Sequence, residues 1–214
     1  MVTTPVLPKN FIFIRIFFLL YFLSSFSSFA QRSTSNAIAY DVRNYGAKGD
    51  GKHVDHHAIN RAIEAANQAG GGTVLIPAGR YLCFSIRLKS YITLQIDAGA
   101  TIVAAHMDEH DGQYDDPEPN PWGELQYQDF GHSHFRNSLI WGENLTDISI
   151  IGPGLIYGKG LQKWGDRTAG LGNKSIALKA CRNVILRDFS ILPGGHFGTL
   201  ATGVDNITIS NLKI

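Results

Sequence analysis

The chain has 214 residues, of which 44% are hydrophobic and 17% are charged, a composition that excludes an intrinsically disordered protein. Its formal net charge is +1 and it has no dense run of Lys or Arg, which argues against nucleic acid as a partner. Glycine, at 23 residues, is more frequent than usual and indicates many tight turns between short strands.

Residues 1–30 differ in composition from the rest. A basic start leads into the hydrophobic run 11–23, and Ser28 and Ala30 fit the small positions of a signal-peptidase site. We expect cleavage before Gln31, secretion to the extracellular space or cell wall, and a linker over residues 31–39. The alternative is a membrane anchor, but this run is shorter than the about 20 apolar residues that a spanning helix needs. We therefore expect no membrane association once the signal is removed.

The next segment predicts a strand, a loop and a helix. Residues 41–45 have the character of a short strand, and a glycine-rich loop follows them. Asp55 is a good N-cap residue, and the apolar residues after it recur at helical spacing. We expect one amphipathic helix over residues 56–69, ended by the three glycines at 70–72.

Four strands and a long excursion come next. The strands are expected at residues 73–76, 81–88, 92–96 and 100–103. Residues 106–136 then break the rhythm, since they are polar, acidic and contain prolines. Loops of this length in compact domains are often functional or disordered.

An internal repeat carries the fold prediction. Segments 183–191 and 206–214 match position for position, and residues 144–150 form a looser upstream copy when Asn144 is aligned with Asn183. In the first pair, the apolar residues Val184, Leu186, Phe189 and Ile191 correspond to Ile207, Ile209, Leu212 and Ile214.

A repeat of this length is typical of a parallel β-solenoid, because one coil cannot bury its own inward row of side chains and stacked coils can. The asparagines at the bends tolerate a left-handed backbone and could stack into a ladder. The fold class we expect is all-β, a parallel β-helix. An antiparallel sandwich with coincidental spacing is the alternative.

The sequence also resembles a known group of enzymes. Residues 41–51 and 70–81 look like the opening of pectin-lyase-like β-helix proteins. Residues 136–164 are more specific and resemble plant-type polygalacturonases of glycoside hydrolase family 28, and the resemblance extends over residues 40–214. It implies a right-handed parallel β-helix with one N-terminal capping helix. It also implies inverting hydrolysis of α-1,4-galacturonosyl bonds in pectin (polygalacturonate) by a monomer without a cofactor or metal.

The chain departs from this family in two ways. Tyr157 stands where members often have Asp. The catalytic signatures of the family, Asn-x-Asp, Asp-Asp, a Gly-His-Gly-like motif and Arg-x-Lys, are expected beyond Ile214. We therefore assign no catalytic residue and expect a truncated, inactive chain whose last apolar run is an uncapped sheet edge. The alternatives are a non-catalytic β-helix that binds wall polysaccharide and a calcium-dependent pectate lyase.

His196, which follows two glycines, is our candidate for substrate contact. Four aromatic residues could stack on sugar rings or belong to the core: Trp122, Tyr127, Trp141 and Trp164. Asp115-Asp116 is interpreted as a solvated acidic loop, and His132-x-His134 as a polar pair on one strand face. Residues 106–111 contain ligand-type side chains, but we expect no metal there.

Secretion would make two kinds of modification possible. Sequons at Asn144, Asn173 and Asn206 are candidate glycosylation sites, although Asn206 at a strand start could have a structural role instead. Cys83 and Cys181 could form a disulfide or remain separate buried thiols.

Overall fold

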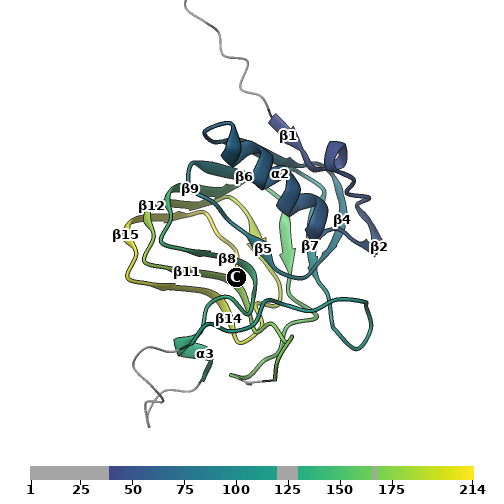
Figure 1. The fold of residues 1–214 in the computed structure, drawn as a ribbon, viewed down its shortest axis with the longest axis vertical. Helices are drawn as coiled ribbons and strands as arrows, with labels where there is room; N and C mark the ends of the chain where they lie inside the picture. The colour runs from purple at the N-terminus through teal and green to yellow at the C-terminus, as the bar shows by residue number, and fades with distance from the viewer. Residues whose placement is uncertain (1–38, 120–129, 166–167) are drawn as a thin grey trace, which may run out of the picture. The chain divides into compact units, whose positions relative to one another are not determined.

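The computed structural model describes residues 39–119, 130–165 and 168–214, arranged as shown in Figure 1. The predicted signal peptide and nearly all of the linker lie outside these residues, so both stay predictions. Within the described segments, no helix combines the length and the apolar character needed to cross a membrane.

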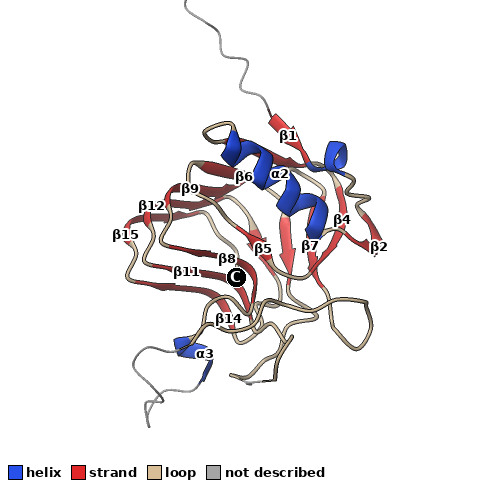
Figure 2. Cartoon of the chain, viewed as in Figure 1, coloured by secondary structure: helices blue, strands red, loops and turns tan. Residues whose placement is uncertain are grey.

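Three parallel sheets build the structure, and Figure 2 shows their strands stacked beside one long helix. Sheet A contains β1 (Ala39–Asp41), β3 (Gly72–Ile76), β6 (Ile92–Ile96), β9 (Thr146–Ile151), β12 (Arg182–Arg187) and β15 (Asp205–Ser210). Sheet B contains β2 (Asp50–Val54), β4 (Gly79–Cys83), β7 (Ala100–Ala104), β10 (Leu155–Tyr157) and β13 (Ser190–Ile191). Sheet C contains β5 (Ile86–Arg87), β8 (Ser138–Glu143), β11 (Lys174–Lys179) and β14 (Phe197–Thr202).

From β5 onward the chain visits sheets C, A and B in turn, and each strand pairs in parallel with the corresponding strand of the next coil. This topology is a parallel β-helix, as predicted, and it excludes the antiparallel sandwich. Alternate side chains point inward, so each position adds one rung to an apolar row along the stack. One such row in sheet A consists of Val74, Leu94, Ile150 and Leu186, all buried.

The observed register confirms one predicted repeat and corrects the other. Val184 pairs with Ile207 in sheet A, as the match between segments 183–191 and 206–214 requires. Aligning Asn144 with Asn183 would put Leu145 opposite Val184, whereas Ile148 occupies that position. The error arose because Asn144 lies at a different corner of its coil, just after β8.

Polar side chains at one corner of the coil form the expected ladder. Asn206 Nδ2 donates to Asn183 Oδ1 at 2.9 Å, and Asn183 Nδ2 donates to Asp147 Oδ1 at 2.8 Å. All three residues have left-handed backbones, with φ between 53° and 55°. Asn and Asp adopt this conformation more readily than most residues, which explains why they recur where the chain turns into sheet A.

The predicted helix is present as α2 (His56–Gln68) and packs on β1, β3 and β5. Its buried face consists of His56, Ala58, Ile59, Ala62, Ile63 and Ala66. Asp55 precedes it, but its carboxylate does not cap the helix. It accepts hydrogen bonds from the backbone N–H groups of Lys48 and Gly49, at 2.7 and 2.9 Å, and so holds the glycine-rich loop.

The strand predicted at residues 41–45 is wrong. β1 ends at Asp41, and Val42–Tyr45 forms the 3-10 helix η1. The Asp41 side chain accepts a hydrogen bond from Arg43 N at 2.9 Å, which favours the helical turn over continued extension. The apolar alternation of a short strand does not reveal such a local cap.

Candidate functional site

Three polar residues are aligned where the chain enters sheet C. Asn137, Asn173 and His196 each stand directly before a strand, namely β8, β11 and β14. Their backbones are stacked, because Asn173 N donates to Asn137 O at 3.1 Å and His196 N donates to Asn173 O at 2.8 Å. We refer to these three residues as the strand-start row. It brings together residues from three successive coils.

A buried lysine orients the amides of this row. Lys174 is fully buried, and its Nζ donates to Asn173 Oδ1 at 2.5 Å and lies 3.4 Å from Asn137 Oδ1. An ammonium group is costly to bury unless hydrogen-bond acceptors surround it. The charge of Lys174 therefore fixes which end of each amide faces the interior.

The row also holds the loop between β10 and β11. Asn173 Nδ2 donates to the carbonyl oxygen of Trp164 at 3.2 Å, and His196 Nδ1 lies 3.0 Å from the carbonyl oxygen of Lys163. Two successive backbone carbonyls are thus fixed, whereas the Trp164 side chain is 75% exposed. An exposed indole on an anchored backbone is suited to stacking against a flat ligand.

The turn before His196 has a strict backbone requirement. Gly195 has φ of +79°, and a Cβ at this position would lie 2.8 Å from the carbonyl oxygen of Asn173. A residue with a side chain would be strained by the backbone angle and would clash with the neighbouring coil. Glycine therefore lets His196 enter the row.

Aromatic rings extend the row on one side. His196 packs edge to face on Phe197, with ring centroids 4.4 Å apart, and His132 lies 4.9 Å from Phe197 and 5.8 Å from His196. The prediction that His132 and His134 share a strand face is wrong. His132 belongs to the short helix α3 (Phe130–Ser133), and the turn that follows leaves His134 buried.

The long excursion folds onto the outer face of sheet C. Arg87 Nε donates to Asp115 Oδ2 at 2.8 Å, and Trp141 Nε1 donates to the same oxygen at 2.8 Å. Asp115 N donates to the Ser85 hydroxyl at 3.0 Å. The interpretation of Asp115 as part of a solvated acidic loop is therefore wrong, because it anchors the excursion, whereas Asp116 is exposed as expected.

A second anchor lies farther along the excursion. Glu118 is buried and accepts hydrogen bonds from the backbone N–H groups of Phe135 and Arg136 at 3.1 Å, while Lys179 Nζ lies 3.5 Å away. Burial raises the pKa of Glu118, but these donors and the Lys179 charge outweigh burial and hold the pKa below its usual value. Lys179 in turn pairs with Glu143 at 3.4 Å.

The remaining predicted features have simpler environments. Trp122 and Tyr127 lie outside the described residues. His106 lies 3.6 Å from Asp108, and across the described segments no group of three or more His, Cys, Asp or Glu side chains is placed to hold a metal. Cys83 and Cys181 are free, buried thiols, and burial raises the pKa of both. Of the two interpretations of the cysteines, separate thiols is the one the structure supports.

The predicted glycosylation sites differ in accessibility. Asn144 and Asn206 are exposed, although Asn206 uses its amide in the ladder. Asn173 is 1% exposed and its Nδ2 is bonded to Trp164 O. A glycan on Asn173 would be incompatible with this packing, so Asn144 and Asn206 remain as the candidate acceptors.

Comparisons with known proteins agree with this architecture. The family described as "Rhamnogalacturonase A/epimerase, pectate lyase-like" matches residues 39–120. A solved exopolygalacturonase from Yersinia enterocolitica superposes with a TM-score of 0.64 and 22% identity, covering 81% of this chain and 38% of that one. The fold is a pectin-lyase-like β-helix.

Relatives found by sequence similarity have names that denote different functions. A polygalacturonase from Chamaecyparis obtusa is 26% identical over 195 residues, covering 83% of this chain and 33% of the relative. Alginate lyase 7 of Azotobacter vinelandii is 47% identical over 70 residues, covering 33% of this chain and 8% of the relative. Plasmin and fibronectin-binding protein A of Streptococcus pneumoniae is 49% identical over 67 residues, covering 30% and 9% respectively. The chain thus spans a third or less of the length of these relatives.

Of the strand-start row, only His196 was predicted from the sequence to contact substrate, and that contact stays a prediction; Asn137 and Asn173 were not predicted to lie beside it. The signal that could have revealed them is the position directly before each strand of sheet C, where Asn137, Asn173 and His196 recur with the same spacing as the paired strands of sheet A. The buried Lys174 had no such signal, since a lysine beside a sequon suggests an exposed loop.

Proposed function

We propose that this chain is part of a secreted, polygalacturonase-like glycoside hydrolase that acts on α-1,4-galacturonosyl bonds of pectin, with inversion, in the cell wall. The observation that carries the proposal is the extent of the similarity to the Chamaecyparis obtusa polygalacturonase, which covers 83% of this chain, whereas the matches to the alginate lyase and to the binding protein cover about a third. The resemblance of residues 136–164 to plant-type polygalacturonases points the same way.

In this proposal the strand-start row binds the polysaccharide. The exposed indole of Trp164 stacks on the apolar face of a sugar ring, and the exposed imidazole of His132 exchanges hydrogen bonds with ring hydroxyls. His196, whose Nδ1 lies 3.0 Å from the Lys163 carbonyl oxygen and whose Nε2 is buried, positions the loop and the His132 ring. Inverting hydrolysis needs two carboxyl groups about 6.5–9.5 Å apart. The strand-start row contains no carboxylate, and its two amides are buried, so its role is to position the loop that carries Trp164, and cleavage requires carboxylates from elsewhere.

Binding of trigalacturonate, measured by isothermal titration calorimetry, tests this role. Trp164→Ala should weaken binding about tenfold, the loss of one stacking contact, and His196→Ala by several-fold. Tyr91→Leu removes another exposed aromatic ring at a distant corner and serves as the matched control. Equal affinity for all four proteins would contradict the proposed binding site.

A second candidate is a non-catalytic β-helix that binds wall polysaccharide. It is favoured by the chemistry of the strand-start row and by the relative named as a plasmin- and fibronectin-binding protein. The transcript beyond the codon for Ile214 separates the two candidates. An Asn-x-Asp motif followed by an Asp-Asp pair supports the hydrolase, and a stop codon supports the binding protein.

A further inference from the structure

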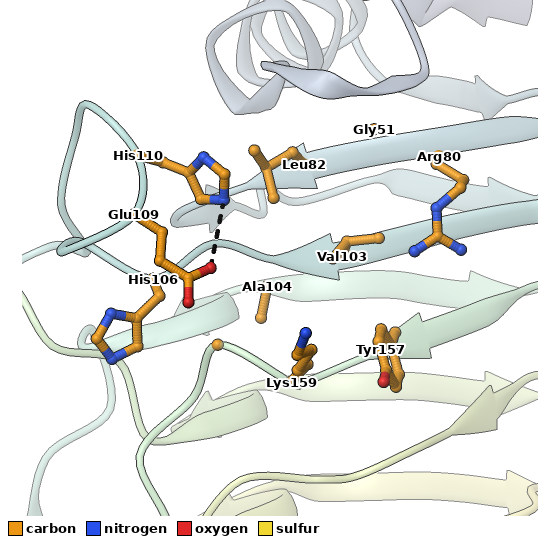
Figure 3. Close-up of a pocket in the computed structure, with 11 residues that line it drawn as sticks. Gly51, Arg80, Leu82, Val103, Ala104, His106, Glu109, His110, Tyr157 and Lys159 are labelled. Atoms are coloured by element: carbon orange, nitrogen blue, oxygen red, sulfur yellow. Dashed lines mark ion pairs between the residues drawn. The ribbon is translucent and has the colours of Figure 1, made fainter.

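A pocket on the outer face of sheet B has no role in the proposed function (Figure 3). Its volume is about 330 Å³, and it lies over the ends of β4, β7 and β10. The floor is the outward column Leu82, Val103 and Tyr157, which the strand register places side by side. It is therefore separate from the strand-start row, which belongs to sheet C.

Two cations that take part in no ion pair within the described ranges border this floor. Arg80 comes from β4 and Lys159 from the residues just after β10, and Figure 3 shows Lys159 beside the Tyr157 ring and Arg80 on the other side of the pocket, beyond Val103. Among the described residues, neither side chain has an ion-pair or hydrogen-bond partner. In contrast, Arg87 and Lys179 on sheet C are both paired with carboxylates.

The opposite wall supplies imidazole and carboxylate groups. His106, Glu109 and His110 come from the start of the long excursion, and His110 Nε2 lies 4.0 Å from Glu109 Oε2. The pocket thus combines an apolar floor with an aromatic ring, two free cations and a cluster of hydrogen-bonding groups. An inorganic anion would contact only the two cations, and a neutral sugar would form no ion pair with them. A ligand that has both a sugar ring and a negative charge matches all of these groups.

We propose that this pocket binds one acidic sugar unit, a hexuronate, of a polysaccharide. The sugar ring lies against Tyr157, its carboxylate is held between Arg80 and Lys159, and its hydroxyls bond to Glu109 and the two histidines. Arg and Lys form charge-assisted hydrogen bonds with carboxylates, and an aromatic ring packs against the C–H face of a sugar.

This pocket would be a second binding site for acidic polysaccharide, away from the strand-start row. Two linked contacts with the same polymer raise the effective affinity because the second contact is intramolecular. The proposal does not depend on hydrolysis at sheet C, since the pocket is built from residues of sheet B, the excursion and the start of the loop after β10.

The test uses trigalacturonate and its fully methyl-esterified form as probes, with the full chain carrying Trp164→Ala so that the strand-start row contributes little. Arg80→Gln and Lys159→Gln should each weaken trigalacturonate binding about tenfold, the loss of one charge-assisted contact, and Tyr157→Ala by a similar factor. The matched control is Arg182→Gln, which removes an exposed cation from sheet A and should change affinity less than about twofold.

The ester should bind about tenfold more weakly than the free acid, because it lacks the carboxylate charge. Three outcomes would overturn the proposal: equal binding of acid and ester, equal effects of Arg80→Gln and Arg182→Gln, or displacement of trigalacturonate by equimolar sulfate. If the pocket variants respond as expected while Trp164→Ala alone has no effect, the pocket stands and the proposed role of the strand-start row fails.

Discussion

Arg87 and Asp115, 28 positions apart in the chain, are joined by two hydrogen bonds. Arg87 Nε donates to Asp115 Oδ2 at 2.8 Å, and Arg87 Nη2 donates to Asp115 Oδ1 at 2.5 Å. This bidentate pair fastens the long excursion to the outer face of sheet C. Trp141 Nε1 donates to the same carboxylate. Asp115 therefore holds both the Arg87 guanidinium and the Trp141 indole in place on this face of the sheet.

Replacing Asp115 should therefore loosen the excursion. Asp115→Asn keeps the shape but removes the charge, and we expect the free energy of unfolding to fall by about 1–2 kcal/mol, because Arg87 is half exposed and its pair is partly screened. Urea denaturation measures the change. The neighbouring Asp116→Asn removes the same charge at an exposed position, and equal losses for both variants would show that Asp115 is not an anchor.

The asparagine ladder makes a separate prediction. Asn183→Ala would remove both hydrogen bonds of the middle rung and place alanine at φ of 55°, so we expect a loss of about 2–3 kcal/mol. Asn183→Gly removes the same bonds but tolerates the backbone angle, and should lose about 1 kcal/mol less. Thermal and urea unfolding of the two variants give both values. A glycine variant as unstable as the alanine variant would contradict the strain argument.

The two thiols should be unreactive in the folded chain. Cys83 and Cys181 are 0% and 1% exposed, and burial raises the pKa of each, so little thiolate is available to react. A thiol reagent should label neither cysteine under native conditions and both in urea. Quantitative labelling before unfolding, or labelling in urea that appears only after reduction, would refute this description.

His56 should make the fold less stable in acid. Burial, followed by the nearby charges of His57 and Arg87, lowers the pKa of His56 from 6.5 to about 4. As pH falls below about 6.5, the His56 imidazole binds a proton in the unfolded state, whereas in the folded state it stays unprotonated until about pH 4. Proton binding therefore favours the unfolded state in this range. The free energy of unfolding should therefore decrease across this window by at most about 3 kcal/mol, and by about 2 kcal/mol after allowance for solvent screening.

His56→Leu removes this titration while keeping an apolar side chain on the buried face of α2. The variant should show a flatter dependence of unfolding free energy on pH between about 6.5 and 4.5. Below that window the loss of the Glu118 charge, whose pKa is also lowered, continues to destabilise both proteins. An unchanged slope within the window would show that His56 is not responsible.

Periodic features of the structure were predictable from the sequence. The correspondence between Val184 and Ile207 is the observed register of sheet A, since one coil must present its apolar residues at the same inward positions as the next. The helix was predictable for the same reason, because its buried face repeats every three to four residues. The alignment of Asn144 with Asn183 failed because asparagines occur at more than one corner of a coil.

Features that follow no repeat could not be predicted from the sequence. The pairs Arg87–Asp115 and Glu118–Lys179 join residues 28 and 61 positions apart through an excursion that follows no repeat. Similarly, the burial of Lys174 depends on hydrogen-bond acceptors from two coils, Asn137 Oδ1 and Asn173 Oδ1, so no local sequence pattern predicts it. Only one member of the strand-start row was a candidate from the sequence. His196 follows two glycines, whereas Asn137 and Asn173 stand in segments of ordinary polar character.

We propose that acidic polysaccharide binds where the chain enters sheet C. Heteronuclear NMR with trigalacturonate tests it most directly, because each amide reports its own surroundings. We predict shifts at the backbone amides of Asn173, His196 and Phe197 and at the indole N–H of Trp164. Saturable binding with no change at these four signals would show that the polysaccharide binds elsewhere.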